Sequence, residues 1–318
     1  MEFQSAQQIS PENLHKTEYD IFILASGYEQ RSIYLPQNFH INAKRKIALA
    51  FYEKTKELNR KNNDAYLISQ GFELISISGD QNIDFELLLS EINKKSGNEH
   101  VNILVDYSSM TKVWYAGIIN HLIGSTKTCK YVSVHFSYTP ALYTELKKAG
   151  PVKVNSTVSY AYKKNNLISK PTALLIGLGL EKSHADFIIK TINPALTILL
   201  YADPSIDIKY VEKVFKNNQE LIEETEVRNL YNFPLISLDQ TNGLITSLCL
   251  GLRTKYNVVI APLGPKVLSL LSLLLASRFP DINVVRVSSG ANSSTSDRIQ
   301  CSEPLIYAAE FVSDDIEF

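Results

Sequence analysis

Short apolar runs rich in Val, Ile and Leu alternate with longer segments of helical periodicity along the whole chain. This alternation is typical of parallel strands connected by helices, because a strand covered on both faces is apolar at successive positions. In the first half, the predicted strands are Ile21–Ala25, Ile47–Tyr52, Leu74–Ile77, Val101–Val105 and Tyr131–Phe136. In the second half, they are Ala173–Ile176, Leu196–Tyr201, Pro234–Leu238, Asn257–Ala261 and Ile282–Val287. The pattern predicts an α/β protein with two mostly parallel five-stranded sheets, each with helices on both faces.

The two halves place matching features at a nearly constant separation, which favours two tandem Rossmann-like domains. Four features of the first half recur about 150 residues later, as an internal duplication requires. The pairs are Gly27 with Gly179, Glu53 with Asp203, Lys112 with Lys266, and the alternating residues 155–162 with residues 305–312. The last pair predicts an added edge strand in each copy. The alternative is that any two doubly wound domains of similar size share such spacing.

The expected domains occupy residues 19–165 and 171–318, after a polar N-terminal extension at residues 1–18. The boundary is expected in the polar stretch from Lys163 to Pro171, where a proline precedes a new apolar run.

Composition and charge narrow the class of protein. The chain has 318 residues, more than one hydrophobic core usually holds. Its 32 basic and 33 acidic residues nearly cancel, so no overall field would hold a long nucleic acid, whereas a small anionic ligand remains compatible. The cysteines lie far apart and indicate a reducing compartment.

Targeting and membrane signals are missing from the sequence. The N-terminus lacks the pattern of a signal peptide. The apolar Val267–Ala276 is shorter than the roughly 20 residues that cross a bilayer, so it predicts a buried helix. We therefore expect a cytoplasmic protein that does not contact a membrane.

Common catalytic and cofactor motifs are also missing. The histidines show no metal-ligand spacing, and no G-x-G-x-x-G, G-x-S-x-G or P-loop motif is present. We expect no bound metal, no NAD and no other cofactor.

The loop after the first strand of each copy is a candidate ligand site. Ligands of open parallel sheets lie beyond the carboxyl ends of the strands, where the strand order reverses between the first and fourth strands. In the first copy, Gly27 permits a tight turn and Glu29 and Arg31 follow it, while the second copy has Gly179 and Glu181. Each glutamate either contacts a ribose hydroxyl or lies at a helix N-terminus, where the helix dipole stabilises it. Arg31 either binds phosphate or pairs with an acidic residue such as Glu29.

The loop after the fourth strand is the second candidate. In the first copy, a run of hydroxyl residues at Ser108, Ser109 and Thr111 precedes Lys112. Backbone amides, hydroxyls and an ammonium together suit a phosphate group. Asp106, at the end of an apolar strand, either acts as a general base or caps the following helix.

The second copy keeps the lysine but replaces the hydroxyl residues, reading Gly264-Pro265-Lys266. If Lys112 and Lys266 face one cleft, the ligand is anionic; otherwise each is a solvated lysine in a first helical turn. Ser289, in the serine-rich stretch after the last parallel strand, either helps to wrap a phosphate or belongs to a flexible loop.

These turns resemble those of the CARF and SAVED families, which are prokaryotic immune sensors of cyclic oligonucleotides. The resemblance lies in the tandem topology, in the first-strand turn from Ser26 to Ser32, and in Ser108-Ser109-Met110-Thr111-Lys112, whose ending is similar to the G-G-T-K turn of CARF domains. It implies a ligand-binding sensor whose effector activity is carried by a separate protein. This chain departs from that turn in both copies, because the paired glycines are serines in the first and the second has Gly264-Pro265-Lys266.

The patterns, together with what the resemblance implies, give three candidate functions. The first is a sensor or regulatory subunit that binds a nucleotide or cyclic oligonucleotide and signals to a partner protein in antiviral defence. The second is a nucleotide-processing hydrolase, either a phosphodiesterase similar to ring nucleases or a glycosidic-bond hydrolase, with Asp106, Glu29 and Lys112 as candidate catalytic residues. The third is a non-catalytic structural subunit of a defence complex.

Overall fold

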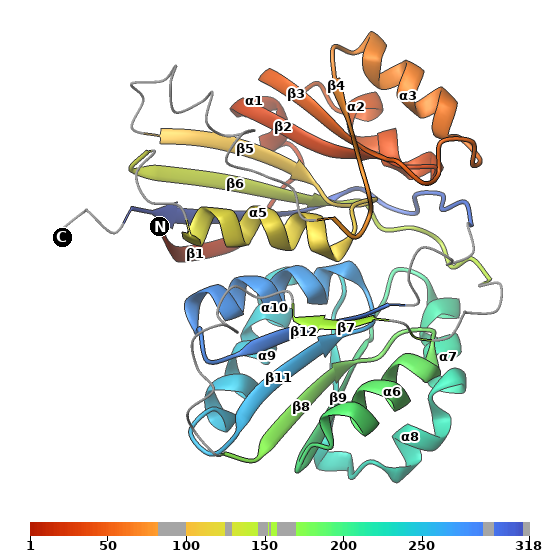
Figure 1. Ribbon diagram of the computed structural model, residues 1–318, viewed down its shortest axis with the longest axis vertical. Helices are drawn as coiled ribbons and strands as arrows, with labels where there is room; N and C mark the ends of the chain where they lie inside the picture. Colours follow the sequence, from red (N-terminus) through yellow and green to blue (C-terminus); the bar gives the residue numbers. More distant parts are fainter. Residues whose placement is uncertain are drawn as a thin grey trace. The chain divides into compact units, whose positions relative to one another are not determined.

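The computed structural model describes residues 1–81, 100–124, 129–145, 152, 154–157, 170–288 and 296–313. Contacts within the chain define two units, one formed by Met1–Thr144 with Thr295–Phe318 and the other by Glu145–Ser294. Each unit is built on one sheet with helices packed around it, so the chain has the predicted α/β architecture (Figure 1). No helix among the described residues is long and apolar enough to span a membrane.

Unit 1 contains a seven-stranded sheet in the order β1-β13-β6-β5-β2-β3-β4. Its strands are β1 (Glu2–Ile9), β2 (Glu18–Ser26), β3 (Asn42–Phe51), β4 (Glu73–Ile77), β5 (His100–Asp106), β6 (Tyr131–Tyr138) and β13 (Leu305–Val312). Its helices are α1 (Asn13–Lys16), the 3-10 helix η1 (Gln30–Ile33), α2 (Tyr34–Asn38), α3 (Arg60–Ser69) and α5 (Lys112–Gly124). Strands β2 to β6 run parallel, and β13 lies antiparallel to both β6 and β1.

Unit 2 contains a six-stranded sheet in the order β10-β9-β8-β11-β12-β7. Its strands are β7 (Val154–Thr157), β8 (Thr172–Gly177), β9 (Leu196–Ala202), β10 (Leu230–Phe233), β11 (Asn257–Pro262) and β12 (Asn283–Ser288). Its helices are α6 (Lys182–Ile192), α7 (Ile208–Asn217), α8 (Gln219–Glu224), the 3-10 helix η3 (Val227–Asn229), α9 (Leu238–Leu252) and α10 (Lys266–Arg278). Strands β8 to β12 run parallel, and β7 lies antiparallel to β12.

The parallel strands follow the same order in both sheets. Counted along the chain within each unit, the order is third, second, first, fourth, fifth, followed by an antiparallel strand. The order therefore reverses between the first and fourth strands of each sheet, as expected from the sequence.

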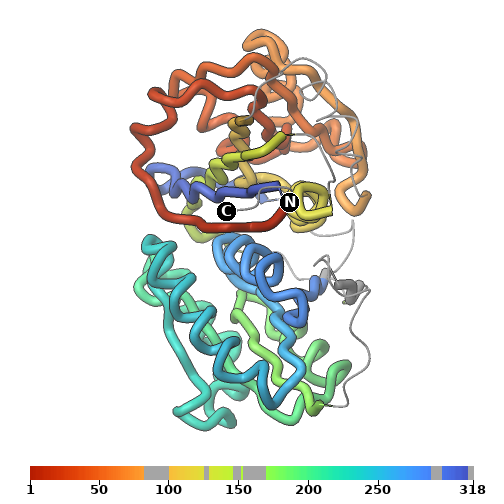
Figure 2. Tube along the Cα trace, turned by 90° about the vertical axis from the view of Figure 1, so that its left-hand side faces the viewer, coloured from red at the N-terminus to blue at the C-terminus, as the bar shows by residue number. Residues whose placement is uncertain are grey.

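The antiparallel strands belong to the opposite halves of the chain from those predicted. β7 follows the first parallel sheet in sequence but pairs with β12 of unit 2, and β13 follows the second but pairs with β6 of unit 1. β13 is not an edge strand either, because β1 pairs with its other side, where Figure 2 shows the blue C-terminal strand beside the red N-terminal one. A period-2 pattern identifies a strand but does not say which sheet accepts it.

This exchange changes the predicted domain boundaries of 19–165 and 171–318. The chain leaves unit 1 after Thr144 and returns to it at Thr295. The predicted N-terminal extension supplies β1 and α1 of unit 1. Residues 158–169, which hold most of the predicted boundary stretch, lie outside the described residues.

One predicted strand is displaced. Pro234–Leu238 was expected to be the third strand of the second half, but β10 ends at Phe233 and α9 begins at Leu238. Pro234 has no amide hydrogen to donate to a neighbouring strand, so the strand ends before it.

The buried helix predicted at Val267–Ala276 is confirmed. Every residue in this range is buried within α10. Apolar residues all round a helix require burial on all sides. The Ser272 hydroxyl donates to the Leu268 carbonyl oxygen one turn earlier, and the Ser269 hydroxyl donates to the carbonyl oxygen of Pro262 at the end of β11.

Inside unit 1, the hydroxyl of Tyr19 forms a 2.7 Å hydrogen bond with Nδ1 of His135. Tyr19 is fully buried on β2 and His135 lies on β6. Burial lowers the pKa of His135 from 6.5 to about 4, because the imidazolium form would lose hydration.

We expect Phe311→Ala to destabilise unit 1 by about 3–5 kcal/mol, because Phe311 is fully buried on β13 and its removal leaves a cavity. Hydrogen exchange should then become faster in β1 and β6 and stay unchanged in β8 and β11. Ile299→Ala, at a residue that is 48% exposed, is the matched control. Faster exchange confined to unit 2 would contradict the assignment of β13 to unit 1.

The His135 pKa gives a pH dependence of stability. Because the folded pKa lies below the unfolded value, the unfolded chain binds the extra proton as the pH falls from 6.5 towards 4, and stability decreases over that window. We expect the free energy of unfolding, measured with urea, to fall between about pH 7.5 and about pH 4.5. The decrease in the wild type should exceed the decrease in His135→Gln by roughly 2–3 kcal/mol. Equal losses in the two proteins would contradict the burial of a neutral imidazole.

Candidate functional site

The loops after β2 and β5 meet at the reversal of strand order in unit 1. A Cβ atom added to Gly27 would lie 3.3 Å from Cβ of Ser109. The Ser109 hydroxyl donates a 3.2 Å hydrogen bond to Oε2 of Glu29. The structure therefore brings Gly27, Glu29 and Ser109 together at the edge of the sheet where the sequence places a ligand.

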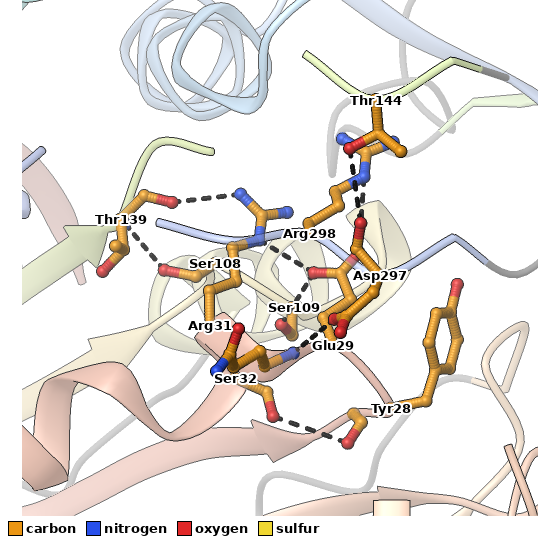
Figure 3. A network of polar contacts seen from close by, with 12 residues as sticks. Tyr28, Glu29, Arg31, Ser32, Ser108, Ser109, Thr139, Thr144, Asp297 and Arg298 are labelled. Atoms are coloured by element: carbon orange, nitrogen blue, oxygen red, sulfur yellow. Dashed lines mark hydrogen bonds and ion pairs between the residues drawn. The ribbon is translucent and has the colours of Figure 1, made fainter. Parts of the chain in front are cut away.

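Arg31 lies beneath this junction and not on its surface. Its side chain is 1% exposed, its Nε donates to Oε2 of Glu29 at 2.8 Å, and a terminal nitrogen donates to the Thr139 carbonyl oxygen at 3.0 Å (Figure 3). The guanidinium also lies 5.8 Å from the centre of the Tyr138 ring. Burial alone would lower the pKa of Arg31, but Glu29 and Tyr138 raise it above its ordinary value, so the side chain stays charged. Arg31 was expected either to bind phosphate or to pair with an acidic residue, and in the structure it pairs with Glu29.

A segment just before β13 completes the junction. Asp297 accepts hydrogen bonds from the Gln30 backbone amide at 2.8 Å and from the Asn59 side-chain amide at 2.9 Å. The backbone amide of Arg31 donates to the Arg298 carbonyl oxygen at 3.2 Å. Residues from both ends of the chain therefore fix the loop after β2.

Arg298 is the cationic side chain of this segment. Its Nε lies 3.5 Å from Oε1 of Glu29, and its side chain is 42% exposed while that of Glu29 is 13% exposed. Glu29 thus contacts Arg31, Ser109 and Arg298 at once (Figure 3). Asp297 and Arg298 were missed in the sequence, because nothing in the local pattern indicates that the C-terminal segment returns to the first sheet.

Asn63 on α3 supports the same loop from within. Its side-chain amide donates to the carbonyl oxygens of Gly27 and Glu29 and to the Ser32 hydroxyl, at 2.9, 3.0 and 2.9 Å. Asn63 is buried. The backbone of the turn is thus held in place before any ligand binds.

The turn after β5 is divided between buried and half-buried residues. Asp106 and Ser108 are buried, and one carboxylate oxygen of Asp106 accepts from both the amide and the hydroxyl of Ser108. The Thr139 amide donates to the same Ser108 hydroxyl at 2.8 Å. Asp106 therefore shapes its own turn, as a cap does. Ser109, Thr111 and Lys112 are half-buried, with Lys112 the first residue of α5.

The corresponding junction of unit 2 is filled by main chain. A Cβ atom on Gly179 would lie 2.4 Å from the Leu263 carbonyl oxygen, and one on Gly264 would lie 2.4 Å from the Leu178 carbonyl oxygen. Only glycine permits this approach at either position. Both glycines were expected beside a ligand. In the structure Gly179 packs against the loop that holds Gly264, and Gly264 packs against the loop that holds Gly179.

Charged candidates of unit 2 have structural contacts or lie at helix starts. Glu181 is the N-cap residue of α6, and its carboxylate lies 2.9 Å from Nδ1 of His184. This geometry matches the helix N-terminal alternative foreseen for Glu181. Lys266 is half-buried at the start of α10. Ser289 lies outside the described residues.

Possible metal ligands are not clustered within the described ranges. No group of three or more His, Cys, Asp or Glu side chains lies close enough there to hold a metal ion.

We expect Arg31→Met to destabilise unit 1 by about 3–5 kcal/mol, because it leaves Glu29 without the buried partner that offsets its charge. The double variant Arg31→Met/Glu29→Gln should recover a large part of that loss, and urea unfolding of the four proteins completes the cycle. Additive effects of the two substitutions would show that the buried pair does not organise the junction.

Comparisons with known proteins leave the family open. No protein-family model and no curated protein matches the sequence. Among solved structures, the cytoplasmic domain of a prokaryotic cation chloride cotransporter aligns over 87% of this chain and 98% of that chain, at 8% sequence identity and a TM-score of 0.24. A likeness this weak carries no argument about fold or function.

Proposed function

We propose that unit 1 binds a small anionic ligand of the nucleotide type at the junction of the β2 and β5 loops. One observation carries the proposal: the two sheets share a strand order, but the junction of unit 1 presents polar side chains and that of unit 2 presents packed main chain. Since a ligand of an open parallel sheet binds at this point, unit 1 has the chemistry for it and unit 2 lacks the space.

The side chains at the junction of unit 1 suit a phosphate group. Arg298 is partly exposed and its Nε faces Glu29, so its terminal nitrogens are the donors for a bidentate contact with a phosphate. Ser109 adds a hydroxyl, and Lys112 adds a cation at the start of the 13-residue helix α5. The N-terminus of a helix favours an anion through its backbone amides and its dipole. Glu29 holds Arg298 and Ser109 in position.

The resemblance of the turns to CARF and SAVED sensors makes a cyclic oligonucleotide the first ligand to test. On this proposal the chain is a cytoplasmic sensor or regulatory subunit of a prokaryotic antiviral system, and binding alters its contact with an effector protein. The shared strand order supports descent of both units from one ancestral Rossmann-like domain. Loss of the polar side chains at the junction of one copy fits such a history.

The contacts of Asp106 favour binding over turnover. A general base must reach the proton that it removes, but Asp106 is 2% exposed and one of its carboxylate oxygens accepts two hydrogen bonds from Ser108. The hydrolase alternative therefore loses its leading candidate, and Glu29 is occupied by three donors. A purely structural subunit would bind no nucleotide at all.

A thermal-shift screen against cyclic oligoadenylates, cyclic dinucleotides and mononucleotides tests the proposal. A ligand at about 100 times its Kd should raise the Tm of unit 1 by about 5–10 °C. Arg298→Gln should weaken binding about tenfold or more, because it removes a charged donor. Lys266→Gln, in unit 2, should leave binding unchanged.

The result divides the alternatives. A response to no nucleotide would contradict the proposal and leave the structural subunit. Binding that is lost with Lys266→Gln and kept with Arg298→Gln would place the ligand in unit 2, against the glycine contacts there.

A further inference from the structure

A second group of residues lies beside the proposed phosphate site, at the ends of β2 and β3. Tyr28 follows Gly27 in the β2 loop and is partly buried. The Lys54 ammonium lies 5.2 Å from the centre of the Tyr28 ring. Tyr52, which directly follows β3, is 71% exposed, and Leu58 in the same loop is 55% exposed. The loops after β2 and β3 thus carry a partly buried aromatic ring with a lysine over it, and two exposed apolar side chains.

Asn59 links the backbone of Tyr28 to Asp297, the residue before Arg298. The Asn59 backbone amide donates to the Tyr28 carbonyl oxygen at 3.2 Å, while the Asn59 side chain donates to Asp297 at 2.9 Å. Figure 3 shows the Tyr28 ring pointing away from the hydrogen-bonded network. Burial and the Glu29 carboxylate raise the pKa of Tyr28 while the charge of Arg298 opposes them, so these groups lie within electrostatic range.

We infer that Tyr28 is the stacking platform for a nucleotide base and that Lys54 covers its ring until the base arrives. This inference rests on the proposed function and adds a binding site for the base of the nucleotide. In an open α/β sheet, phosphate binds at the loop after the first strand, and the nucleoside extends towards the end of the second strand. In unit 1 those positions are the junction at Glu29 and Arg298, and the loop that carries Tyr52 and Lys54.

Replacing the Lys54 ammonium over the Tyr28 ring with a nucleotide base should lower the free energy of the complex. A base stacked on an aromatic ring gains more than an ammonium gains over a partly exposed ring. The displaced Lys54 ammonium carries a positive charge on a flexible stem and can turn towards the phosphate. Every base has an aromatic face, so stacking favours nucleotides as a class but does not distinguish one base from another.

Calorimetric titration of the full chain with AMP and with ribose 5-phosphate tests the inference, because the two probes differ by the base. The wild type should bind AMP more tightly than ribose 5-phosphate. Tyr28→Leu should weaken AMP binding about tenfold and leave ribose 5-phosphate binding unchanged. Tyr28→Phe keeps the ring and should bind AMP as the wild type does. Lys54→Met should weaken ribose 5-phosphate binding more than it weakens adenosine binding.

The outcomes separate this inference from the proposed function. Equal binding of AMP and ribose 5-phosphate, or unchanged AMP binding by Tyr28→Leu, would overturn the stacking role and leave the anion site standing. Equal losses in Tyr28→Leu and Tyr28→Phe would assign the effect to the hydroxyl and also overturn stacking. Failure of the wild type to bind either probe would overturn the stacking role, whereas the anion site is overturned only if the thermal-shift screen also shows no response to any nucleotide.

Discussion

A buried positive charge is the constraint on which the edge of unit 1 depends. Arg31 is 1% exposed, and a buried guanidinium is tolerated only where opposite charge and hydrogen-bond acceptors surround it. Glu29 and the Thr139 carbonyl group supply these, one from the β2 loop and the other from just after β6. The requirement fixes the direction of the Glu29 carboxylate, and that carboxylate in turn positions Ser109 and Arg298. The surface chemistry of the junction therefore follows from an electrostatic requirement beneath it.

The return of the C-terminal strand is the second condition for the junction. β13 pairs with β6 on one side and β1 on the other, so the last strand in sequence is internal to the first sheet. Asp297 and Arg298 reach the β2 loop because β13 follows them closely. The site thus combines residues from two segments of the chain that are separated in sequence by unit 2.

Sequence patterns predicted the parallel strands well and the partners of the other strands poorly. The apolar runs of Ile21–Ala25 and Val101–Val105 fall inside β2 and β5, because burial on both faces leaves a clear composition signal. Residues 305–312 were predicted as a strand and form β13. Their assignment to a second domain was wrong, since alternation carries no information about the accepting sheet.

The candidate site was predicted in part for similar reasons. Gly27, Glu29 and Ser109 could be found from the turns after the first and fourth strands. Arg31 was named with two roles, and only burial decides between them. Arg298 and Asn63 carry no local signal, because their importance comes from contacts across a long stretch of sequence.

The two units illustrate how one strand order supports different surfaces. Gly179 and Gly264 allow the loops of unit 2 to approach within backbone contact, while the side chains of Ser109 and Glu29 join the loops of unit 1 through a hydrogen bond. Hydrogen–deuterium exchange with and without saturating cyclic oligoadenylate tests this difference most directly. The account predicts slower exchange at residues 26–32 and 107–112 and no change at residues 177–181 and 262–266. Protection confined to the unit 2 loops, or none in either unit, would contradict it.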